Sequence, residues 1–466
     1  MLERSYAVGE HLVPEERGWL DWRLAEVAGQ HYRQLTISFT KDGLRSAGEA
    51  PRTWNRLALQ KNLLVALATV DPAEAIRQLG TLEPPVSTAA GTFPEDVRSH
   101  AAKLIFLAYL KKRGANGLPT VTRVAHYLGE TGQYPYAAIG AIIHSGIPPS
   151  AATALASTSV ERYRTPSKFQ RETKDFIEFL QLAEGKVPAS ILREGGRLAL
   201  DRLRSNSQQT SGKFLAAIRS KTESVTLTSE TQVYLAELLP ILQLIDPESI
   251  SKELKSDPTT AALLRVTSEP HHLEATMLHT EEQPAPQAQL RGIERSRLST
   301  IRVIASEKPA QAAALADELT IPPFRVAGLA RAAGGYSNQE RKEGLALLTR
   351  AANEWEKLES ASAKLSAGAE IVDAAQKLKE TSIFRQMFGK LFAIGEELVS
   401  EQLDAKPAAL LADCEGFDEL SQLANLGSRF DPAWTYEEVS AVRNDALKAF
   451  LLAEMADGLL ADLTAE

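Results

Sequence analysis

The sequence predicts an all-α protein made of stacked antiparallel helix pairs, which form an α-α superhelix, or solenoid. Aromatic residues make up only 6% of the chain while Ala and Leu recur throughout, and this composition disfavours a β-sandwich or β-barrel core. Apolar residues recur at helical spacing in short stretches that proline or glycine separates. Because one short helix pair cannot bury both of its apolar stripes, each pair is expected to pack against the next.

The stretch KPAQAAALADELTIPPFRVAGLARAAGG (308–335) shows such a pair most clearly. Pro309 suits the first turn of a helix, and the prolines after Ile321 end that helix because the residue before a proline avoids helical geometry. The apolar positions of the two predicted helices are Ala312, Leu315, Ala316 and Leu319, then Val326, Leu329, Ala330 and Ala333. Gly334 and Gly335 are expected to end the second helix in a left-handed conformation.

The N-terminal part divides into two predicted segments. Residues 1–50 form an irregular helical segment, in which Trp19 and Trp22 anchor a helix and LTISF (35–39) is a helix end or a short extended piece. Residues 51–204 form an N-terminal helical-hairpin array. Its helices are expected at 53–69, 71–82, 96–113, 120–129, 134–145, 150–163, 167–184 and 188–204.

The remaining chain is assigned to a middle segment, a linker and a second array. Residues 213–279 form a middle helical segment after a loop at 205–212, with a further polar break at 220–229. TEEQPAPQAQLR (280–291) has two prolines and no apolar periodicity, which predicts an extended linker. Residues 292–466 form a C-terminal helical-hairpin array.

Long helices are expected in that array at 338–366, 382–402 and 437–463. The closing helix is apolar on more than one face, where the end of a solenoid is normally polar. It therefore folds back on the chain, docks on another chain or marks a truncated chain.

Four segments share a polar residue, a proline and then apolar residues at helical spacing. They are DPAEAIRQL (71–79), DPESISKEL (246–254), KPAQAAALA (308–316) and KPAALLADC (406–414). On these segments the chain resembles α-helical repeat proteins of the HEAT and TPR-like superfamily, particularly bacterial chains rich in helices that begin with Asp-Pro. The resemblance covers about residues 57–460 and implies a solenoid that binds proteins. The Trp, Gly and Tyr pattern of a true TPR is missing, so a TPR peptide groove is not implied.

Composition and charge restrict the partners. The start of the chain lacks a basic region followed by an apolar one, and no run of about 18 apolar residues occurs, so a cytoplasmic protein without a membrane partner is expected. The net charge of −8 disfavours general nucleic-acid binding. The charge is unevenly distributed. Residues 160–221 carry 13 Lys or Arg and 7 Asp or Glu, whereas residues 351–466 carry 10 Lys or Arg and 22 Asp or Glu. These regions are solvated helix faces, or they meet different partners or one another.

Two groups of residues are candidates for chemistry. SEPHHLEATMLHTEEQ (268–283) contains His271, His272 and His279 among glutamates, and a helix would bring His272 and His279 to one face, where they could hold a metal with Glu269, Glu274, Glu281 or Glu282. Its spacing matches no established metal motif, so a solvated connection is favoured and no metal or cofactor is assigned. In residues 126–144, His126, Tyr127, Tyr134, Tyr136 and His144 alternate with glycines and could line a small pocket or pack structurally.

No other catalytic signature is present. The chain has no phosphate-binding glycine motif and no nucleophile elbow, and its one cysteine, Cys414, has no nucleophile motif around it and is expected to be a core residue. No residue is therefore assigned a catalytic, cofactor-binding or metal-binding role. The favoured function is a non-enzymatic helical-repeat scaffold with a protein partner. The alternatives are an α/α-fold enzyme with a central pocket, of hydrolase or lyase type, and a protein that binds the DNA backbone through residues 160–221.

Overall fold

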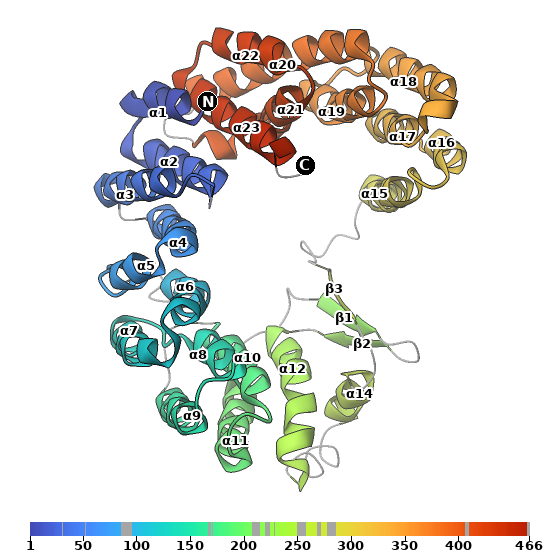
Figure 1. Cartoon of the computed structure of the whole chain (residues 1–466). Helices are drawn as coiled ribbons and strands as arrows, with labels where there is room; N and C mark the ends of the chain where they lie inside the picture. The colour runs from blue at the N-terminus through green and yellow to red at the C-terminus, as the bar shows by residue number, and fades with distance from the viewer. Residues whose placement is uncertain are drawn as a thin grey trace. The chain divides into compact units, whose positions relative to one another are not determined.

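The computed structural model confirms the all-α class, since helices packed side by side make up most of the chain (Figure 1). It describes all residues except 30, 52, 85–95, 166–168, 170, 207–214, 220–223, 228, 249–257, 268–271, 277–285, 406–409 and 464–466. The chain forms two compact units. Unit 1 contains Met1–Ala28 and Gln283–Glu466, and unit 2 contains Gly29–Glu282. Unit 2 is therefore an insertion in the sequence of unit 1.

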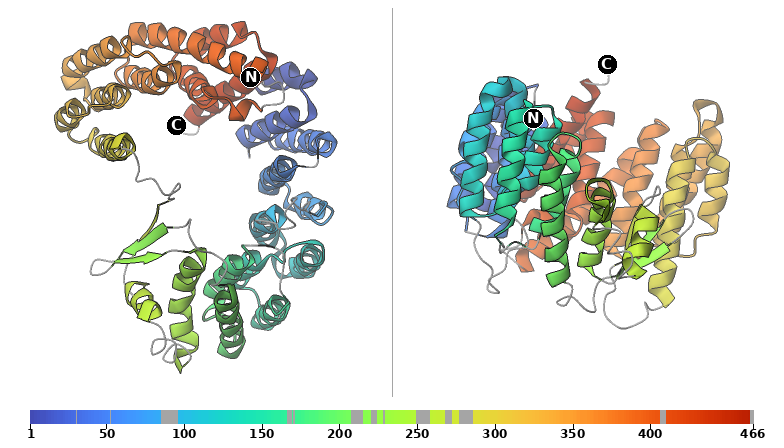
Figure 2. Two further views of the ribbon diagram at one scale, coloured as in Figure 1. Left: turned by 180° about the vertical axis from the view of Figure 1, so that it is seen from behind. Right: turned by 90° about the horizontal axis from the view of Figure 1, so that it is seen from below.

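Unit 2 is a two-row helical array followed by a small sheet. Its helices are α3 (Arg33–Glu49), α4 (Trp54–Val70), α5 (Pro72–Leu79), α6 (Val97–Arg113), η2 (Gly114–Gly117), α7 (Leu118–Thr131), α8 (Tyr136–His144), α9 (Pro149–Tyr163), α10 (Glu172–Ala183), α11 (Ala189–Asn206), α12 (Glu230–Ile245) and α14 (Pro258–Thr267). Helices α4, α6, α8, α10 and α12 form one row, in which each helix contacts the next. Helices α5, α7, α9 and α11 form the second row, which packs on the first (Figure 2).

The sheet of unit 2 was not predicted. Strands β1 (Leu215–Arg219), β2 (Ser224–Leu227) and β3 (His272–Thr276) pair antiparallel in the order β2-β1-β3. The sheet contacts α12 and α14, and Ile218 and Leu227 are buried in the unit's core. The segment 213–279 is therefore not wholly helical, and β2 lies in what was expected to be a polar break.

Close helix contacts hold the first row together. A Cβ atom on Gly140 of α8 would lie 2.9 Å from Phe179 Cα of α10, so only glycine allows this approach. Beside this contact, the rings of Tyr163 and Phe176 stack with centroids 3.7 Å apart, and Tyr136 meets both rings edge-on. The glycine contact and the three rings thus join α8, α9 and α10 in the core of unit 2.

Unit 1 repeats the two-row arrangement. Its elements are α1 (Leu2–Val8), η1 (Gly9–His11), α2 (Pro14–Ala28), α15 (Pro286–Ile304), α16 (Pro309–Asp317), α17 (Pro322–Gly334), η3 (Asn338–Glu340), α18 (Arg341–Trp355), α19 (Ala361–Lys377), α20 (Thr381–Ala405), η4 (Leu411–Asp413), α21 (Phe417–Phe430), α22 (Pro432–Ala441) and α23 (Asp445–Leu463). Helices α15, α17, α19, α21 and α23 form one row, and α16, α18, α20 and α22 pack on it. No described helix has the length and apolarity needed to cross a bilayer.

The start of the chain packs on its closing helix. Helices α1 and α2 both contact α23, and α21 also packs on that helix. The hydroxyl of Ser5 donates to the carbonyl of Ala449 at 2.7 Å. The apolar surface of α23 is therefore covered within the chain, so the closing helix folds back. The expected segment 1–50 is divided, because α3 belongs to unit 2.

The hairpin at 308–335 forms as predicted, with α16 and α17 burying the expected alanines, leucines and valine almost throughout. The expected left-handed end is wrong: Gly335 has φ −84°. Glycine is needed there for space, because a Cβ atom would lie 2.0 Å from the carbonyl oxygen of Ala305.

Five other expectations differ from the structure. The single helix expected at 338–366 is split into α18 and α19, and the one at 437–463 is split between α22 and α23. Residues 286–291 of the expected linker belong to α15, while 280–285 lie outside the described residues. LTISF (35–39) lies inside α3. In KPAALLADC, 406–409 lie outside the described residues and only the short turn η4 follows.

Candidate functional site

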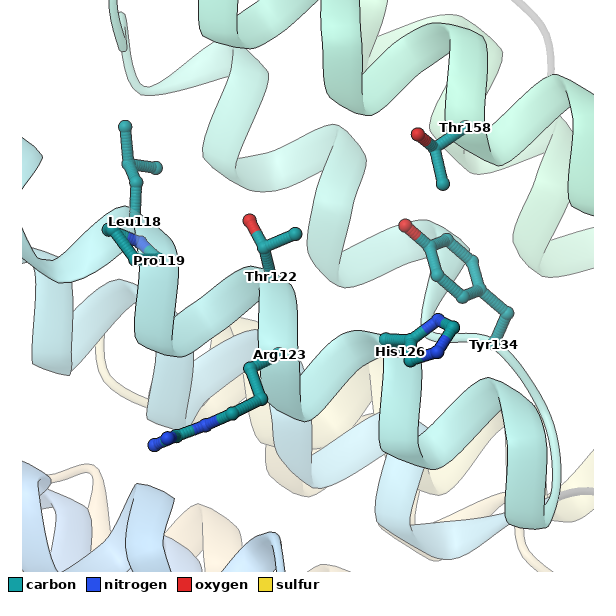
Figure 3. A pocket seen from close by; sticks show the side chains of 7 residues that line it. All are labelled: Leu118, Pro119, Thr122, Arg123, His126, Tyr134 and Thr158. Atoms are coloured by element: carbon teal, nitrogen blue, oxygen red, sulfur yellow. The ribbon is translucent and has the colours of Figure 1, made fainter.

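A groove of about 540 Å³ lies between α7 and α9. Five of its lining residues come from one side of α7, namely Leu118, Pro119, Thr122, Arg123 and His126 (Figure 3). Their spacing of three to four residues places them along one face of the helix. Thr158 of α9 and Tyr134 of the α7–α8 turn complete the groove.

The groove changes from apolar to polar along α7. Leu118 and Pro119 form its apolar end, and the exposed hydroxyls of Thr122 and Thr158 follow. Arg123 is exposed and forms no ion pair with any residue that the structure describes. The groove can therefore accommodate an apolar side chain beside a hydrogen-bonding group or an anion.

The polar end contains a cluster of charged and aromatic groups. Arg162 Nη2 lies 2.6 Å from Glu130 Oε1 and 2.6 Å from His126 Nδ1. Arg162 lowers the pKa of Glu130, which therefore stays ionised at neutral pH. The Arg162 guanidinium also lies 5.7 Å from the ring centre of Tyr134. Arg162 thus links α9 to α7 and holds the imidazole of His126 at the groove.

Tyr134 lies against the side of the groove and is only 5% exposed. Burial raises the pKa of its phenol, although a hydrogen bond with Ser159 and the charge of Arg162 act in the opposite direction. The Tyr134 hydroxyl therefore stays protonated and points toward Thr158 (Figure 3).

A buried polar network fixes the turn that carries Tyr134. Asp96 and Arg98 are fully buried and form a salt bridge of 2.7 Å. The backbone N–H of Gln133 donates to Asp96 Oδ2 at 3.1 Å, and the Asp96 N–H donates to Gln133 Oε1 at 3.3 Å. The Gln133 amide also donates to Asp175 of α10. These bonds join the starts of α6, α8 and α10 and hold the α7–α8 turn in place.

The structure brings together only part of the pocket expected within 126–144. His126 and Tyr134 line the groove. Tyr127 instead donates to the carbonyl of Leu82 at 3.0 Å, and Tyr136 lies in the aromatic core. His144 Nδ1 lies 3.3 Å from the carbonyl oxygen of Leu182. Arg123, Thr158 and Leu118 were not singled out from the sequence, although the i, i+4, i+8 spacing of residues 118, 122 and 126 marks one face of a helix.

The helix expected around the histidines of 268–283 is not formed at His272. His272 and Glu274 belong to strand β3, where they pair with Arg219 and Ala217 of β1. Glu269, His271, His279, Glu281 and Glu282 lie outside the described residues. Among the residues that the structure describes, no three His, Cys, Asp or Glu side chains are placed to hold a metal ion.

Most described arginines of the basic region 160–221 bind groups of the same chain. The ion pairs are Arg162 with Glu130, Arg164 with Glu161 and Glu194, Arg197 with Asp246, Arg202 with Glu172 and Arg204 with Asp201. Arg193 donates to the carbonyl of Ile245. Phosphate binding would have to compete with these carboxylates, so a contiguous phosphate-binding surface gains no support from this region.

Cys414 is buried, 7% exposed, as expected for a core residue. Burial raises the pKa of its thiol, and the carboxylates of Asp413 and Glu16 raise it further. A raised thiol pKa does not suit a nucleophile.

No family model, no curated protein and no solved structure matches this chain. The class of this protein is therefore defined by its fold alone. Successive helix pairs in two rows make each unit an α-helical solenoid-like array.

Proposed function

We propose that this chain is a HEAT- or TPR-like scaffold that binds another protein through the α7–α9 groove. The observation that carries the proposal is that Arg123, which no described residue pairs with, lies beside the apolar Leu118 and Pro119 in an open groove. Helical arrays commonly present such grooves between successive helices as binding surfaces. The expected ligand is an extended segment with an apolar side chain next to a carboxylate.

The rigidity of the groove supports this role. Arg162 joins its two helices, and the buried Asp96–Arg98–Gln133 network fixes the turn that bears Tyr134. A groove that keeps its shape loses little conformational entropy when a peptide binds. No specific observation supports either alternative function, an α/α-fold enzyme or a protein that binds the DNA backbone.

The test compares baits that differ at one position. Thr122→Trp fills the middle of the groove, while Ser440→Trp adds the same side chain at an exposed position of α22. Pull-down with mass spectrometry should recover a partner with the original chain and with Ser440→Trp, but not with Thr122→Trp. Failure to recover any specific partner under several conditions, or equal recovery by all three baits, would contradict the proposal.

The chemistry of the ligand is tested separately with Arg123→Glu. This change leaves the groove open but reverses its free charge, so it should weaken binding of a carboxylate-bearing partner by about tenfold or more. Unchanged binding would mean that Arg123 does not select the ligand.

A further inference from the structure

Helix α15 has a face that no described residue of unit 1 covers. On one side Glu294, Ile301 and Ala305 are buried, where α15 contacts α16 and α17. On the opposite side Gly292, Ser296, Ser299 and Val303 follow one another at helical spacing, and all are exposed. A Cβ atom on Gly292 would meet no atom within 4 Å. These four residues and the side chains that flank them are called the α15 face.

Two large exposed apolar side chains lie on or beside the α15 face. Large apolar side chains are exposed at only seven described positions of the chain, and three of these lie on α15, namely Leu290 at 41%, Ile293 at 56% and Val303 at 75%. At 100° per residue, Val303 lies on the α15 face and Ile293 at its edge, whereas Leu290 lies on the side of Ile301 and Glu294. Val303 and Ile293 therefore supply the exposed apolar surface of this face.

The charges on α15 differ from those on the helices that follow it. Arg291, Arg295, Arg297 and Arg302 are all exposed, and none forms an ion pair within the described part of the chain. Several arginines of the following helices instead bind carboxylates of neighbouring helices. Examples are Arg325 with Glu354 at 2.7 Å, Arg331 with Glu370 at 2.5 Å and Arg350 with Asp317 at 2.5 Å. Among the described residues, Arg295 and Arg302 have no such carboxylate, whereas the charge of Arg297 acts on Glu294 of the same helix.

Helical geometry places two of these arginines along one edge of the α15 face. Arg295 and Arg302 lie seven residues apart along this edge, and Ile293 lies along the opposite edge. The small side chains at positions 292, 296 and 299 lie between the two edges. Arg297 lies beyond Ile293, toward Glu294, whose pKa its charge lowers. This arrangement leaves room for another helix to approach closely, with its edges beside the guanidinium groups.

We propose that the α15 face binds an acidic amphipathic helix of a partner protein, which continues the array by one helix. Apolar side chains of the partner pack on Val303 and Ile293, and its flanking carboxylates bind Arg295 and Arg302. The carboxylate class follows from charge complementarity, and Arg325, Arg331 and Arg350 of the same unit each bind a carboxylate of a neighbouring helix. This surface is in unit 1 and does not depend on the α7–α9 groove of unit 2.

The probe is a fluorescent helical peptide of about 20 residues, enough for a helix as long as α15, with leucines along one face and glutamates beside them. A second peptide has lysine in place of each glutamate. Fluorescence anisotropy with the full chain should show binding of the glutamate peptide only. The double variant Arg295→Glu/Arg302→Glu should weaken binding by about tenfold or more. Ser296→Trp, which fills the small-residue stripe, should weaken it as well.

Two controls make the result specific. Arg429→Glu reverses another exposed arginine of unit 1, on α21, and should leave peptide binding unchanged. Circular dichroism should show that every variant keeps its helical content. The proposal is overturned if the glutamate peptide does not bind, if the lysine peptide binds equally well, or if the double variant binds like the original chain. Binding of random duplex DNA that the same double variant abolishes would assign the face to nucleic acid, and would overturn it too.

Discussion

Arg23 and Glu454 form a bidentate ion pair, with Nε to Oε1 at 2.6 Å and Nη2 to Oε2 at 2.7 Å. The pair joins α2 to α23, and both side chains are largely buried, at 20% and 14% exposure. Arg23 Nη2 also lies 3.1 Å from Asp457 Oδ2. These carboxylates and that of Glu26 hold the pKa of Arg23 above its usual value although burial opposes them, so the arginine stays charged.

Replacing Arg23 with alanine should therefore destabilise unit 1. The change leaves Glu454 and Asp457 close together without a cation, and we expect a loss of about 2 kcal/mol, between the values for exposed and buried pairs. Urea unfolding measures the loss. Arg45→Ala is the matched control, because the Arg45 side chain is 70% exposed and pairs, among the described residues, with Asp42 in the next turn back. Equal effects of the two variants would show that the α2–α23 ion pair adds nothing to stability.

The environment of Glu294 predicts that the free energy of unfolding depends on pH in the acid range. Burial alone would raise the pKa of this carboxylate, but hydrogen bonds from Thr320 and from the backbone N–H groups of Thr320 and Ile321, both at 2.8 Å, lower it. The pKa of Glu294 is therefore lower in the folded chain than in the unfolded chain. The stabilisation by ionised Glu294 is complete above the unfolded-state pKa and is lost as the pH falls through the folded-state pKa.

Glu294→Gln should remove that dependence and cost about 2 kcal/mol at neutral pH, as expected when hydrogen bonds to a charged group are lost. Unfolding free energies between about pH 3 and pH 7 bracket the usual carboxyl range and would test this. Parallel pH curves for the variant and the original chain would contradict the assignment.

Gly140→Ala should destabilise unit 2 by about 1–3 kcal/mol, since the new methyl group overlaps the backbone of Phe179. Gly389→Ala in α20 is the control, because a Cβ atom there meets nothing within 4 Å. The control should stabilise its helix by up to about 1 kcal/mol through helix propensity. Thermal melts should therefore shift in opposite directions. Equal shifts would mean that α8 and α10 do not approach closely at this glycine.

Removing one partner of the buried Asp96–Arg98 pair should cost about 3 kcal/mol, because the other charge is left buried. Arg98→Met is the more informative change, since methionine fills much of the arginine's volume. The double variant Asp96→Ala/Arg98→Met should lose less than the sum of the single changes, as measured by urea unfolding. Strict additivity would mean that the two residues do not act as a pair.

Cys414 should react slowly with thiol reagents in the folded chain. Its raised thiol pKa and its burial both reduce attack by the thiolate at pH 8. A disulfide reagent monitored by absorbance should label it quickly only after denaturation. The control is the double variant Cys414→Ala/Thr158→Cys, which places the one thiol in the exposed groove. This thiol should react at once in the folded chain. Fast labelling of native Cys414 would contradict its buried position.

The helix hairpins could be predicted because proline and glycine mark their ends in the sequence. The break between α18 and α19 could not, since no proline or glycine occurs near it. Ser360 starts α19 there by accepting from the N–H of Ala363 at 3.4 Å. The sheet was missed because β2 contains only four residues, SVTL, in a polar stretch.

The groove could be predicted only in part, because its geometry depends on how helices pack. His126 and Tyr134 were noticeable as residue types, but their position beside Thr158 depends on how α7 packs near α9. The Asp96–Arg98 pair was also not visible, because residues two apart do not share a helix face. Arg98 reaches back around Asp96, the residue that begins its own helix.

The placement of residues 1–28 against α23 has a consequence for synthesis on the ribosome. Unit 2 is continuous in sequence, so it can fold as soon as its own residues have emerged. Helices α1 and α2 are translated before unit 2, but their apolar side chains can pack against α23 only after residues 445–463 have been synthesised. During most of translation these early helices are therefore without their permanent neighbour and are open to chaperones.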